Sequence, residues 1–411
     1  SMPGKPVKLT FDGAHGAKLA ARLDMPTGPV KAYALFAHCF TCTKDLSAAR
    51  KIAEALTLQG IGVLRFDFTG LGGSSGDFAS TNFTSNLDDL ERAADFLRDE
   101  FEAPKLLIGH SLGGAAVLAV ADRVPEATAI ATIGAPADVD HVTHNFAAHL
   151  DDIKNNGEAE VSLGGRPFVI KRQFVDDLAN HDLARAVGQM RKALLVLHAP
   201  MDQTVGIENA AKIFDAAKHP KSFVSLDDAD HLLRDPANAE YAASVIAAWA
   251  GRDIPADKAG ENDIGNGVVV RETGQGKFQA MVMAGRHRML ADEPENVGGF
   301  DSGPSPYEFL SAALGSCTVM TVRMYADHKN IPLEAVRAEI LHDKIHADDC
   351  AECAEEHAQK GGKIDRFERK ITFVGDLDDG TRAKLLEIAD KCPVHRTLEA
   401  TSLIVTREER A

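Results

Sequence analysis

A glycine-flanked serine lies between an apolar run and an alanine-rich segment, and this arrangement constrains the fold more than any other feature of the chain. The run Lys105–Ile108 leads into Gly109–Gly113, with the sequence Gly-His-Ser-Leu-Gly, and Ala and Val follow. A serine in this context occupies a tight turn between a β-strand and an α-helix, where glycines let the two elements approach. We therefore expect Ser111 to be a nucleophile at the end of a parallel strand.

Strand and helix patterns alternate through the first 250 residues. Short runs of apolar and β-branched residues predict strands, and apolar residues at three- and four-residue spacing between them predict helices. Such alternation is typical of βα units and a mainly parallel sheet. The expected strands are Ala32–Ala37, Gly62–Phe66, Lys105–Ile108, Ala129–Ile133, Ala193–Leu197 and Ser222–Leu226, and the expected helices include Leu46–Leu58 and Leu87–Leu97.

Two segments interrupt this alternation. Residues from about 139 to 190 contain a polar helix and a Gly-Gly hairpin, Val161–Val169, which we interpret as a small cap. Residues 251–266 are polar, contain Gly and Pro and have no periodicity, as interdomain linkers do. The sequence therefore predicts a first domain over residues 1–250, this linker, and a second domain over residues 267–411.

The second domain has the pattern of an α+β fold around one long helix. Pro306–Lys329 is mostly apolar and predicts a buried central helix, and Thr381–Ala389 predicts a second helix. Alternating segments predict antiparallel strands. These strands are Val268–Arg271, Lys277–Met283, His287–Ala291, Ala338–Lys344, Lys370–Val374 and a last one at Thr401–Thr406.

Two residues that follow predicted strands complete a catalytic set with Ser111. Asp202 comes after Ala193–Leu197, and His231 comes after the last strand of the first domain. In the chain order Ser, Asp, His, the imidazole takes the serine proton and the carboxylate orients the imidazole. The acids between 227 and 230 lie nearer to His231 in sequence, but the strand-end position favours Asp202.

Backbone N–H groups are expected to stabilise the oxyanion. One comes from Leu112, at the start of the helix after the serine, and the other from Phe40, in the loop after Ala32–Ala37. The same loop contains Cys39 and Cys42. Their simplest interpretation is two small buried residues, and a redox switch at the mouth of the site is the alternative.

These residues give the first domain a family resemblance. Ser111, Asp202 and His231, together with the glycine-rich segment Arg65–Gly76 after a strand, make residues 5–250 resemble α/β-hydrolase-fold esterases. The resemblance implies an α/β fold in which a carboxylic ester with a small to medium acyl group is hydrolysed. A perhydrolase, which would use hydrogen peroxide as acceptor, is the alternative because the same catalytic set supports it.

Cysteines suggest a second chemistry in the last third of the chain. Cys317 lies inside the long apolar helix, where a cysteine is usually a small core residue. Cys392 precedes Pro393, and proline suits the first turn of a helix, so Cys392 is expected to cap a helix N-terminus. The N–H groups and dipole at that position favour the thiolate, the form that attacks an electrophile.

The segments Ser305–Cys317 and Asp390–Val394 resemble the OsmC/Ohr family of thiol peroxidases, and the resemblance covers about residues 265–411. It implies that Cys317 attacks an organic hydroperoxide, that Cys392 resolves it as a disulfide and that a dithiol restores both. It also implies that Glu308 orients the groups around the thiolate, and that the protein forms an intertwined homodimer through this domain. A non-catalytic dimerisation or binding module is the alternative.

The family's arginine, expected in a loop before the glutamate, has no counterpart in Asn296–Phe300. Four residues are possible substitutes, and the sequence does not rank them. They are Arg286, His287, Arg288 and Arg323.

A cluster of possible metal ligands remains open at this stage. His342, His346, Cys350, Cys353 and His357 lie in one acidic stretch, for which an exposed loop, a zinc site and a local disulfide are the candidate interpretations. We predict no cofactor and no metal.

Overall composition limits the partners. The net charge of −16 opposes a nucleic-acid surface, and no apolar run suits a membrane span. The N-terminus lacks the pattern of a signal peptide, and six cysteines in 411 residues are too few for a disulfide scaffold, so we expect a cytoplasmic protein acting on small molecules.

Overall fold

The computed structural model describes residues 7–27, 30–39, 44–163, 166–254, 267–346 and 362–409. The chain forms two compact units. The larger unit comprises Met2–Gln275 with Ala280–Leu290, and the smaller comprises Gly276–Gln279 with Ala291–Ala411. Each unit is described by itself.

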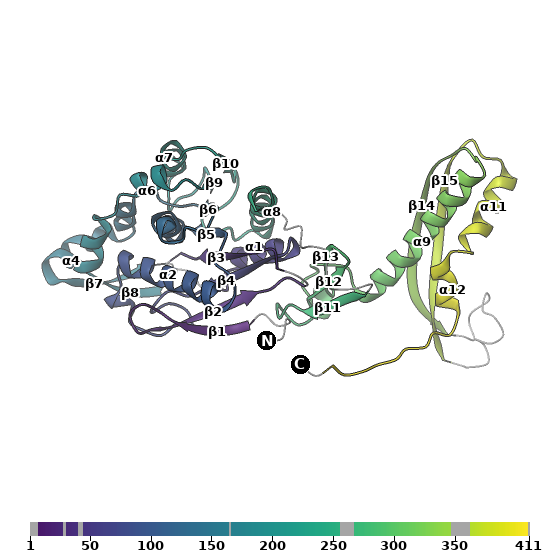
Figure 1. The fold of residues 1–411 in the computed structure, drawn as a ribbon, viewed down its shortest axis with the longest axis horizontal. Helices are drawn as coiled ribbons and strands as arrows, with labels where there is room; N and C mark the ends of the chain where they lie inside the picture. Colours follow the sequence, from purple (N-terminus) through teal and green to yellow (C-terminus); the bar gives the residue numbers. More distant parts are fainter. Residues whose placement is uncertain are drawn as a thin grey trace. The chain divides into compact units, whose positions relative to one another are not determined.

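The larger unit contains an eight-stranded sheet in the order β1-β2-β4-β3-β5-β6-β9-β10 (Figure 1). Strands β4 to β10 in this order are parallel, while β1 and β2 are antiparallel. The six predicted strands are confirmed, and β1 and β2 were not predicted. The bounds are β1 Val7–Asp12, β2 Lys18–Asp24, β3 Ala32–Ala37, β4 Ile61–Phe66, β5 Leu106–His110, β6 Ala129–Ile133, β9 Ala193–His198 and β10 Lys221–Ser225.

Helices cover both faces of this sheet. Successive residues of β5 show the two faces, because Leu107 packs in one apolar core and Ile108 in the other. Helices α1 (Ser47–Leu58) and α8 (Pro236–Asp253) close the face of Ile108. The helices on the opposite face are α2 (Phe83–Glu100), α3 (Leu112–Ala119), α6 (Leu183–Gln189) and α7 (Glu208–Ala216). This two-faced burial explains why the central strands, β3, β4, β5, β6 and β9, are mostly apolar.

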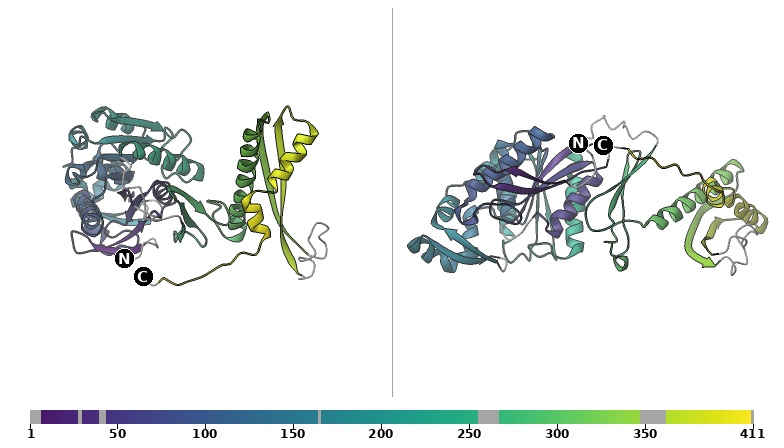
Figure 2. Two further views of the ribbon diagram at one scale, coloured as in Figure 1. Left: turned by 45° about the vertical axis from the view of Figure 1, so that its right-hand side comes forward. Right: turned by 90° about the horizontal axis from the view of Figure 1, so that it is seen from below.

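The predicted Gly-Gly hairpin is present within the expected cap. Strands β7 (Glu158–Leu163) and β8 (Arg166–Lys171) pair antiparallel, and they lie at one end of the larger unit with α4 (Leu150–Asn156), as Figure 1 and Figure 2 show. The segment also contains α5 (Arg172–Leu178). The short 3₁₀ helices of the unit are η1 Phe78–Ser80, η2 Ala121–Arg123 and η3 Val139–His149.

A three-stranded antiparallel sheet follows residues 255–266, which lie outside the described residues. It consists of β11 (Val268–Glu272), β12 (Ala280–Ala284) and β13 (His287–Ala291). Gln275 Nε2 donates to Asp24 Oδ1 at 2.9 Å, and Arg288 Nε donates to the Thr27 carbonyl at 2.9 Å. Most of this sheet therefore belongs to the larger compact unit, and the division of the chain at residues 251–266 stays a prediction.

The smaller unit packs helices against a long hairpin. Helix α9 (Pro306–His328) contacts β14 (Leu333–His346), which pairs with β15 (Lys363–Gly375). Helices α11 (Asp379–Ala389) and α12 (Pro393–Glu399) pack on α9, and η5 spans Glu295–Val297. Their shared core consists of Val322, Ala326, Leu333, Phe373, Leu385 and Ala389.

Two predictions for this unit are wrong. The long helix is not buried, because only Leu314, Thr318, Val322 and Ala326 are buried, while Met320 and Met324 are 69% and 70% exposed. The segment Thr401–Thr406 is not a strand, and its Leu403 is 90% exposed. Both segments are apolar in sequence, and these side chains stay exposed among the described residues of one chain.

Candidate active site

Ser111 occupies the turn that the sequence predicts between β5 and α3. Its φ of 56° and ψ of −124° are in a region that non-glycine residues rarely adopt. The Ser111 N–H donates to the Ile133 carbonyl at 2.7 Å, which ties the turn to the neighbouring strand. A Cβ on Gly109 would lie 2.2 Å from the Gly113 carbonyl oxygen, and one on Gly113 would lie 2.2 Å from the Ala37 carbonyl oxygen. The glycines are therefore required by backbone contact.

The structure brings Ser111, His231 and Asp202 together. His231 Nε2 lies 2.8 Å from Ser111 Oγ, and His231 Nδ1 lies 2.6 Å from Asp202 Oδ2. The side chain of Asp202 is 1% exposed and that of His231 is 11% exposed. Hydrogen bonds at both ring nitrogens fix the tautomer in which Nδ1 carries the proton and Nε2 accepts from the serine.

Asp202 is held as an ionised carboxylate. Its Oδ1 accepts the backbone N–H groups of Thr204 and Val205, each at 2.8 Å. Burial raises the pKa of Asp202, but the bonds from His231, Val205 and Thr204 outweigh burial and lower it overall. Two rival acids accept hydrogen bonds elsewhere, Asp227 from Ser225 Oγ and Asp230 from the Arg234 N–H.

Buried histidines surround this set. His110 Nε2 lies 2.7 Å from the carbonyl oxygen of His231, and burial, followed by the charge of His231, lowers the pKa of His110 to about 4. Burial also lowers the pKa of His38. His198 Nε2 lies 2.8 Å from the Val205 carbonyl oxygen. His110 and His38 are therefore neutral around neutral pH and add no positive charge to this cluster.

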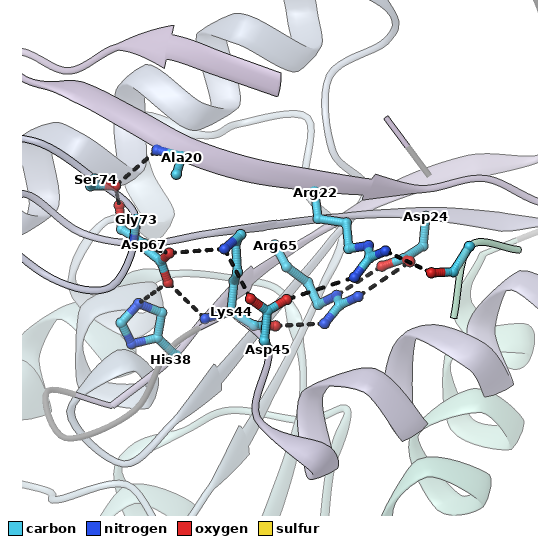
Figure 3. Close-up of polar contacts among 11 residues, drawn as sticks. Ala20, Arg22, Asp24, His38, Lys44, Asp45, Arg65, Asp67, Gly73 and Ser74 are labelled. Atoms are coloured by element: carbon cyan, nitrogen blue, oxygen red, sulfur yellow. Dashed lines mark hydrogen bonds and ion pairs between the residues drawn. The ribbon is translucent and has the colours of Figure 1, made fainter. Parts of the chain in front are cut away.

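Asp67 in the glycine-rich segment after β4 holds residues on both sides of segment 40–43 (Figure 3). Its carboxylate accepts the Lys44 N–H at 2.7 Å, Lys44 Nζ at 3.1 Å and the Gly73 N–H at 3.0 Å. His38 Nε2 lies 3.5 Å from Asp67 Oδ1. Gly72 has a φ of +52°, and a Cβ there would lie 2.5 Å from the Asp67 carboxylate. The sequence favours a structural role for Asp67, and it could not specify these contacts with Lys44 and Gly73.

Arg65 connects this carboxylate to a second ionic group. Its Nε lies 2.8 Å from Asp24 Oδ2, and its Nη1 donates to the Lys44 carbonyl at 2.5 Å. Since Gln275 also donates to Asp24, the segment beyond the predicted linker contacts the same network.

Of the two expected oxyanion donors, the structure describes one. Leu112 is the first residue of α3, where a backbone N–H has no partner within the helix. Phe40 lies outside the described residues, as does Cys42. Cys39 is buried, as the simpler interpretation expects, and it is disulfide-bonded, which that interpretation does not include.

In the smaller unit, Cys392 is the N-cap of α12, as predicted, and it is buried. Its Sγ accepts the His395 N–H at 3.3 Å and lies 3.9 Å from Thr318 Oγ1. Cys317, the neighbour of Thr318 in α9, is partly exposed, and both cysteines are free thiols. Thr318 on α9 therefore contacts Cys392, and this residue was not predicted from the sequence.

Glu308 and the four candidate substitutes for the missing arginine make contacts of other kinds. The Glu308 carboxylate accepts the Ser305 N–H at 2.8 Å and caps α9, while its expected role at the thiolate stays a prediction. Arg288 contacts Thr27 in the larger unit, Arg323 Nη1 donates to the Leu333 carbonyl at 2.7 Å, and Arg286 and His287 are exposed. Arg369 on β15 instead donates to Thr318 Oγ1 at 3.0 Å.

The candidate metal ligands are only partly described. Cys350, Cys353 and His357 lie outside the described residues. His342 stacks on Tyr307 with 4.3 Å between ring centroids, and its Nε2 lies 2.8 Å from Asp365 Oδ1. Within the described part of the chain, no group of three His, Cys, Asp or Glu side chains could hold a metal ion.

Comparison with known families matches these two regions. The family described as serine aminopeptidase S33 matches residues 29–157, and the family described as OsmC-like protein matches residues 299–407. A solved esterase domain of a Rhodothermus marinus protein is 52% identical, with a TM-score of 0.51, and the match covers 61% of this chain and 99% of that domain. This chain is an α/β hydrolase joined to an OsmC-like domain.

More distant relatives agree with the hydrolase fold. The mitochondrial palmitoyl-protein thioesterase ABHD10 of Rattus norvegicus is 27% identical over 46% of this chain, and the match spans 64% of that relative's length. The match to the structure of mouse α/β hydrolase domain-containing protein 10 has a TM-score of 0.51 at 21% identity. It covers 60% of this chain and 99% of the mouse chain. Among the helices of the residues described, none is long and apolar enough to cross a membrane.

Proposed function

We propose that the hydrolase domain is a serine carboxylesterase in which Ser111 is the nucleophile, His231 the general base and Asp202 the residue that orients His231. The observation that carries this proposal is the continuous pair of hydrogen bonds, 2.8 Å from Ser111 Oγ to His231 Nε2 and 2.6 Å from His231 Nδ1 to Asp202 Oδ2. A serine hydroxyl is a weak nucleophile until a positioned base accepts its proton.

In the proposed reaction, Ser111 Oγ attacks the ester carbonyl while His231 takes the serine proton. The N–H groups of Leu112 and Phe40 stabilise the oxyanion, and His231 then donates the proton to the departing alcohol. Water attacks the acyl-enzyme by the same route, with His231 again as base, and releases the carboxylic acid. Neutral His110 supports this sequence because no second charge opposes protonation of His231.

The descriptions of two relatives suggest two substrate classes for this chain. The Rhodothermus marinus domain is described as an esterase, and ABHD10 is described as a palmitoyl-protein thioesterase. We place oxygen esters of small to medium acids first, on the similarity to the esterase domain. Acyl thioesters are the second class, because the same acyl-enzyme forms from either substrate.

Hydrolysis of p-nitrophenyl acetate, butyrate and octanoate tests this function, with an S-octanoyl thioester as comparison. The Ser111→Ala variant should lose hydrolysis of all substrates, whereas Ser222→Ala, at an exposed position on β10, should keep it. Equal rates for wild type and Ser111→Ala would contradict the assignment. Preference for the thioester would keep the catalytic set and change the substrate class.

For the OsmC-like domain we propose a thiol peroxidase that acts as a homodimer. The Cys317 thiolate attacks the hydroperoxide, the O–O bond breaks and the alcohol leaves with a proton. Cys392 then attacks the sulfenic sulfur, so that a disulfide forms and water leaves, and an external dithiol restores both thiols as it becomes a disulfide. Free Cys317 and Cys392 support this chemistry.

Exposed apolar side chains support the dimer. Met320 and Met324 on α9, and Leu403, Ile404 and Val405 near the C-terminus, are 64% to 90% exposed. Consumption of cumene hydroperoxide with dithiothreitol, compared between wild type, Cys317→Ser and Ser316→Ala, tests the chemistry. Only Cys317→Ser should be inactive. No consumption by any protein, with no Cys317–Cys392 disulfide in the mass spectrum, would leave a binding or dimerisation module.

A further inference from the structure

One guanidinium gathers the polar groups around Cys392. The Arg369 side chain is 10% exposed, and its Nη1 donates to Thr318 Oγ1 and to the Ala389 carbonyl, each at 3.0 Å. Its Nη2 lies 2.6 Å from Asp390 Oδ1 and 2.7 Å from His395 Nδ1. These contacts join β15 to α9, to the end of α11 and to α12.

His395 is held in one tautomer by this arginine. Arginine has only donors, so His395 Nδ1 must accept and carry a lone pair. His395 Nε2 then carries the proton and lies 3.0 Å from Glu399 Oε1. The fixed ring belongs to the residue whose backbone N–H donates to Cys392 Sγ at 3.3 Å, so the same contacts hold that donor in place.

Thr318 links the arginine to the sulfur. Its hydroxyl donates to the Leu314 carbonyl at 2.7 Å and accepts from Arg369, which leaves one lone pair facing Cys392 Sγ at 3.9 Å. Thr318 and Cys392 are both 0% exposed, so water does not solvate the sulfur. In the reduced protein the Cys392 S–H is therefore the donor to Thr318 Oγ1.

A charge on this sulfur requires compensation. When Cys392 loses its proton, a buried anion appears, and burial without a partner disfavours the charged form. The His395 N–H already points at the sulfur, and the Thr318 hydroxyl can turn from the Leu314 carbonyl to donate to it. The positive charge of Arg369, one hydroxyl away, favours both changes.

We propose that Arg369 is the positioning residue of the thiol site, which stabilises the Cys392 thiolate through Thr318. This inference rests on the proposed thiol function and deepens it. It gives the buried Cys392 a nearby cation, Arg369, whose guanidinium contacts the same Thr318 hydroxyl as the Cys392 sulfur does. The charged or titratable groups gathered here are Arg369, Asp390, His395 and Glu399.

Thiolate absorbance at 240 nm tests the proposal in the full-length protein. Spectra from pH 5 to 10 of a Cys317→Ser protein, minus those of the Cys317→Ser, Cys392→Ser protein, isolate Cys392. With Arg369→Met, the thiolate fraction at pH 7 should fall about tenfold. Arg366→Met is the matched control, because Arg366 lies on the same strand and pairs with Asp343, with 44% of its side chain exposed. It should leave the absorbance profile unchanged.

Variants of Thr318 separate positioning from packing. Thr318→Val keeps the shape without the hydroxyl and should reproduce the change seen with Arg369→Met, whereas Thr318→Ser should retain the wild-type profile. A lower melting temperature of Arg369→Met or Thr318→Val with an unaltered absorbance profile would overturn the proposal. The readout needs no peroxide turnover, so a wild-type protein that passes this test but consumes no hydroperoxide would refute the peroxidase and leave the role of Arg369 standing. If Arg369→Met does not fold, the absorbance profile of Thr318→Val decides whether the proposal stands.

Discussion

The two units differ in how completely one copy of the chain surrounds the reactive residue. In the hydrolase, Asp202 and His231 are 1% and 11% exposed, and helices cover both faces of the sheet that carries Ser111. In the OsmC-like domain, Cys317 lies on a helix whose Met320 and Met324 are about 70% exposed. The candidate hydrolase residues therefore come together within the described part of one chain, whereas in the smaller unit Cys392 is buried and one side of α9 is exposed.

This difference follows from the layers that each unit possesses. A sheet with helices on both faces buries its strands without help, whereas a two-stranded hairpin with helices on one side leaves apolar surface uncovered. Large exposed apolar areas on a folded unit mark interaction surfaces. The comparison therefore predicts that substitutions in the hydrolase act within one chain, while those on the open side of the smaller unit act through assembly.

The largest effect is expected from replacing Asp202, the acid that we assign to the catalytic set of the hydrolase. Asp202→Asn keeps the shape but replaces the acceptor of the His231 Nδ1–H, so kcat for ester hydrolysis should fall about 10³- to 10⁴-fold. Asp227→Asn is the control, because Asp227 lies near His231 in sequence and accepts from Ser225 Oγ. Loss of activity in Asp227→Asn but not in Asp202→Asn would reverse the assignment.

A second prediction concerns stability in acid, of which the hydrolase should lose more than the smaller unit. The pKa of His110 is about 4 in the folded protein, below the ordinary value of 6.5, so the unfolded chain binds its proton first as pH falls. The stabilisation is full above pH 6.5 and is lost between pH 6.5 and pH 4, by about 3 kcal/mol.

Urea unfolding of the larger unit at pH 7, 5.5 and 4.5 measures this loss. His110→Asn should flatten the dependence on pH, and His287→Asn, at an exposed position in the same unit, should not. Among the described residues of the smaller unit none of the buried side chains is a histidine, so its unfolding should respond less to acid. Equal slopes in wild type and His110→Asn would contradict the prediction.

A third prediction sharpens the contrast between closed and open sites. The double change Met320→Lys, Met324→Lys places charges on the open side of α9 and should weaken the homodimer about tenfold or more, measured by sedimentation velocity over a concentration series. Tyr241→Lys changes an exposed residue of α8 in the larger unit and is the control. Ester hydrolysis should stay unchanged in both. A wild-type protein that is monomeric at every concentration would refute the dimer.

The smallest expected effect lies within the hydrolase. Asp67→Asn keeps the shape of a side chain with no exposed surface but removes the charge that faces Lys44 and His38, so kcat should fall about tenfold with little change in KM. Asp45→Asn alters a neighbour whose side chain is 53% exposed and should change kcat less than about twofold. A rise in KM alone for Asp67→Asn would indicate a role in substrate binding instead.

Much of the hydrolase could be predicted because its signals are local. The turn at Ser111 needs glycines in the neighbouring positions, and these contacts leave a pattern in five consecutive residues. Asp202 and His231 follow strands whose apolar composition is readable, and parallel strands bring their carboxyl ends to one edge. A structural role for Asp67 was expected, but its donors from Lys44 and Gly73 are known only from the tertiary structure.

The smaller unit was less predictable for the same reason. Capping at Cys392 was predicted because Pro393 marks the first helical turn, and Pro306 likewise begins α9. The missing arginine was sought close to Glu308 in sequence, although Arg369 comes from a strand some sixty residues further along the chain. Alternation of apolar and polar residues in a strand shows which side chains share a face, but not which other element packs against that face.

By itself, the sequence determined two fold classes, a glycine-flanked serine in the turn at a strand end and a helix-capping cysteine, because each depends on steric and hydrogen-bonding rules within a few residues. Only the tertiary structure decided that Thr318 contacts Cys392, that Arg369 donates to Thr318, and that Met320 and Met324 stay exposed in one chain. The phase of a helix against its neighbours is set by packing across the whole unit, and packing joins residues whose separation in sequence carries no signal.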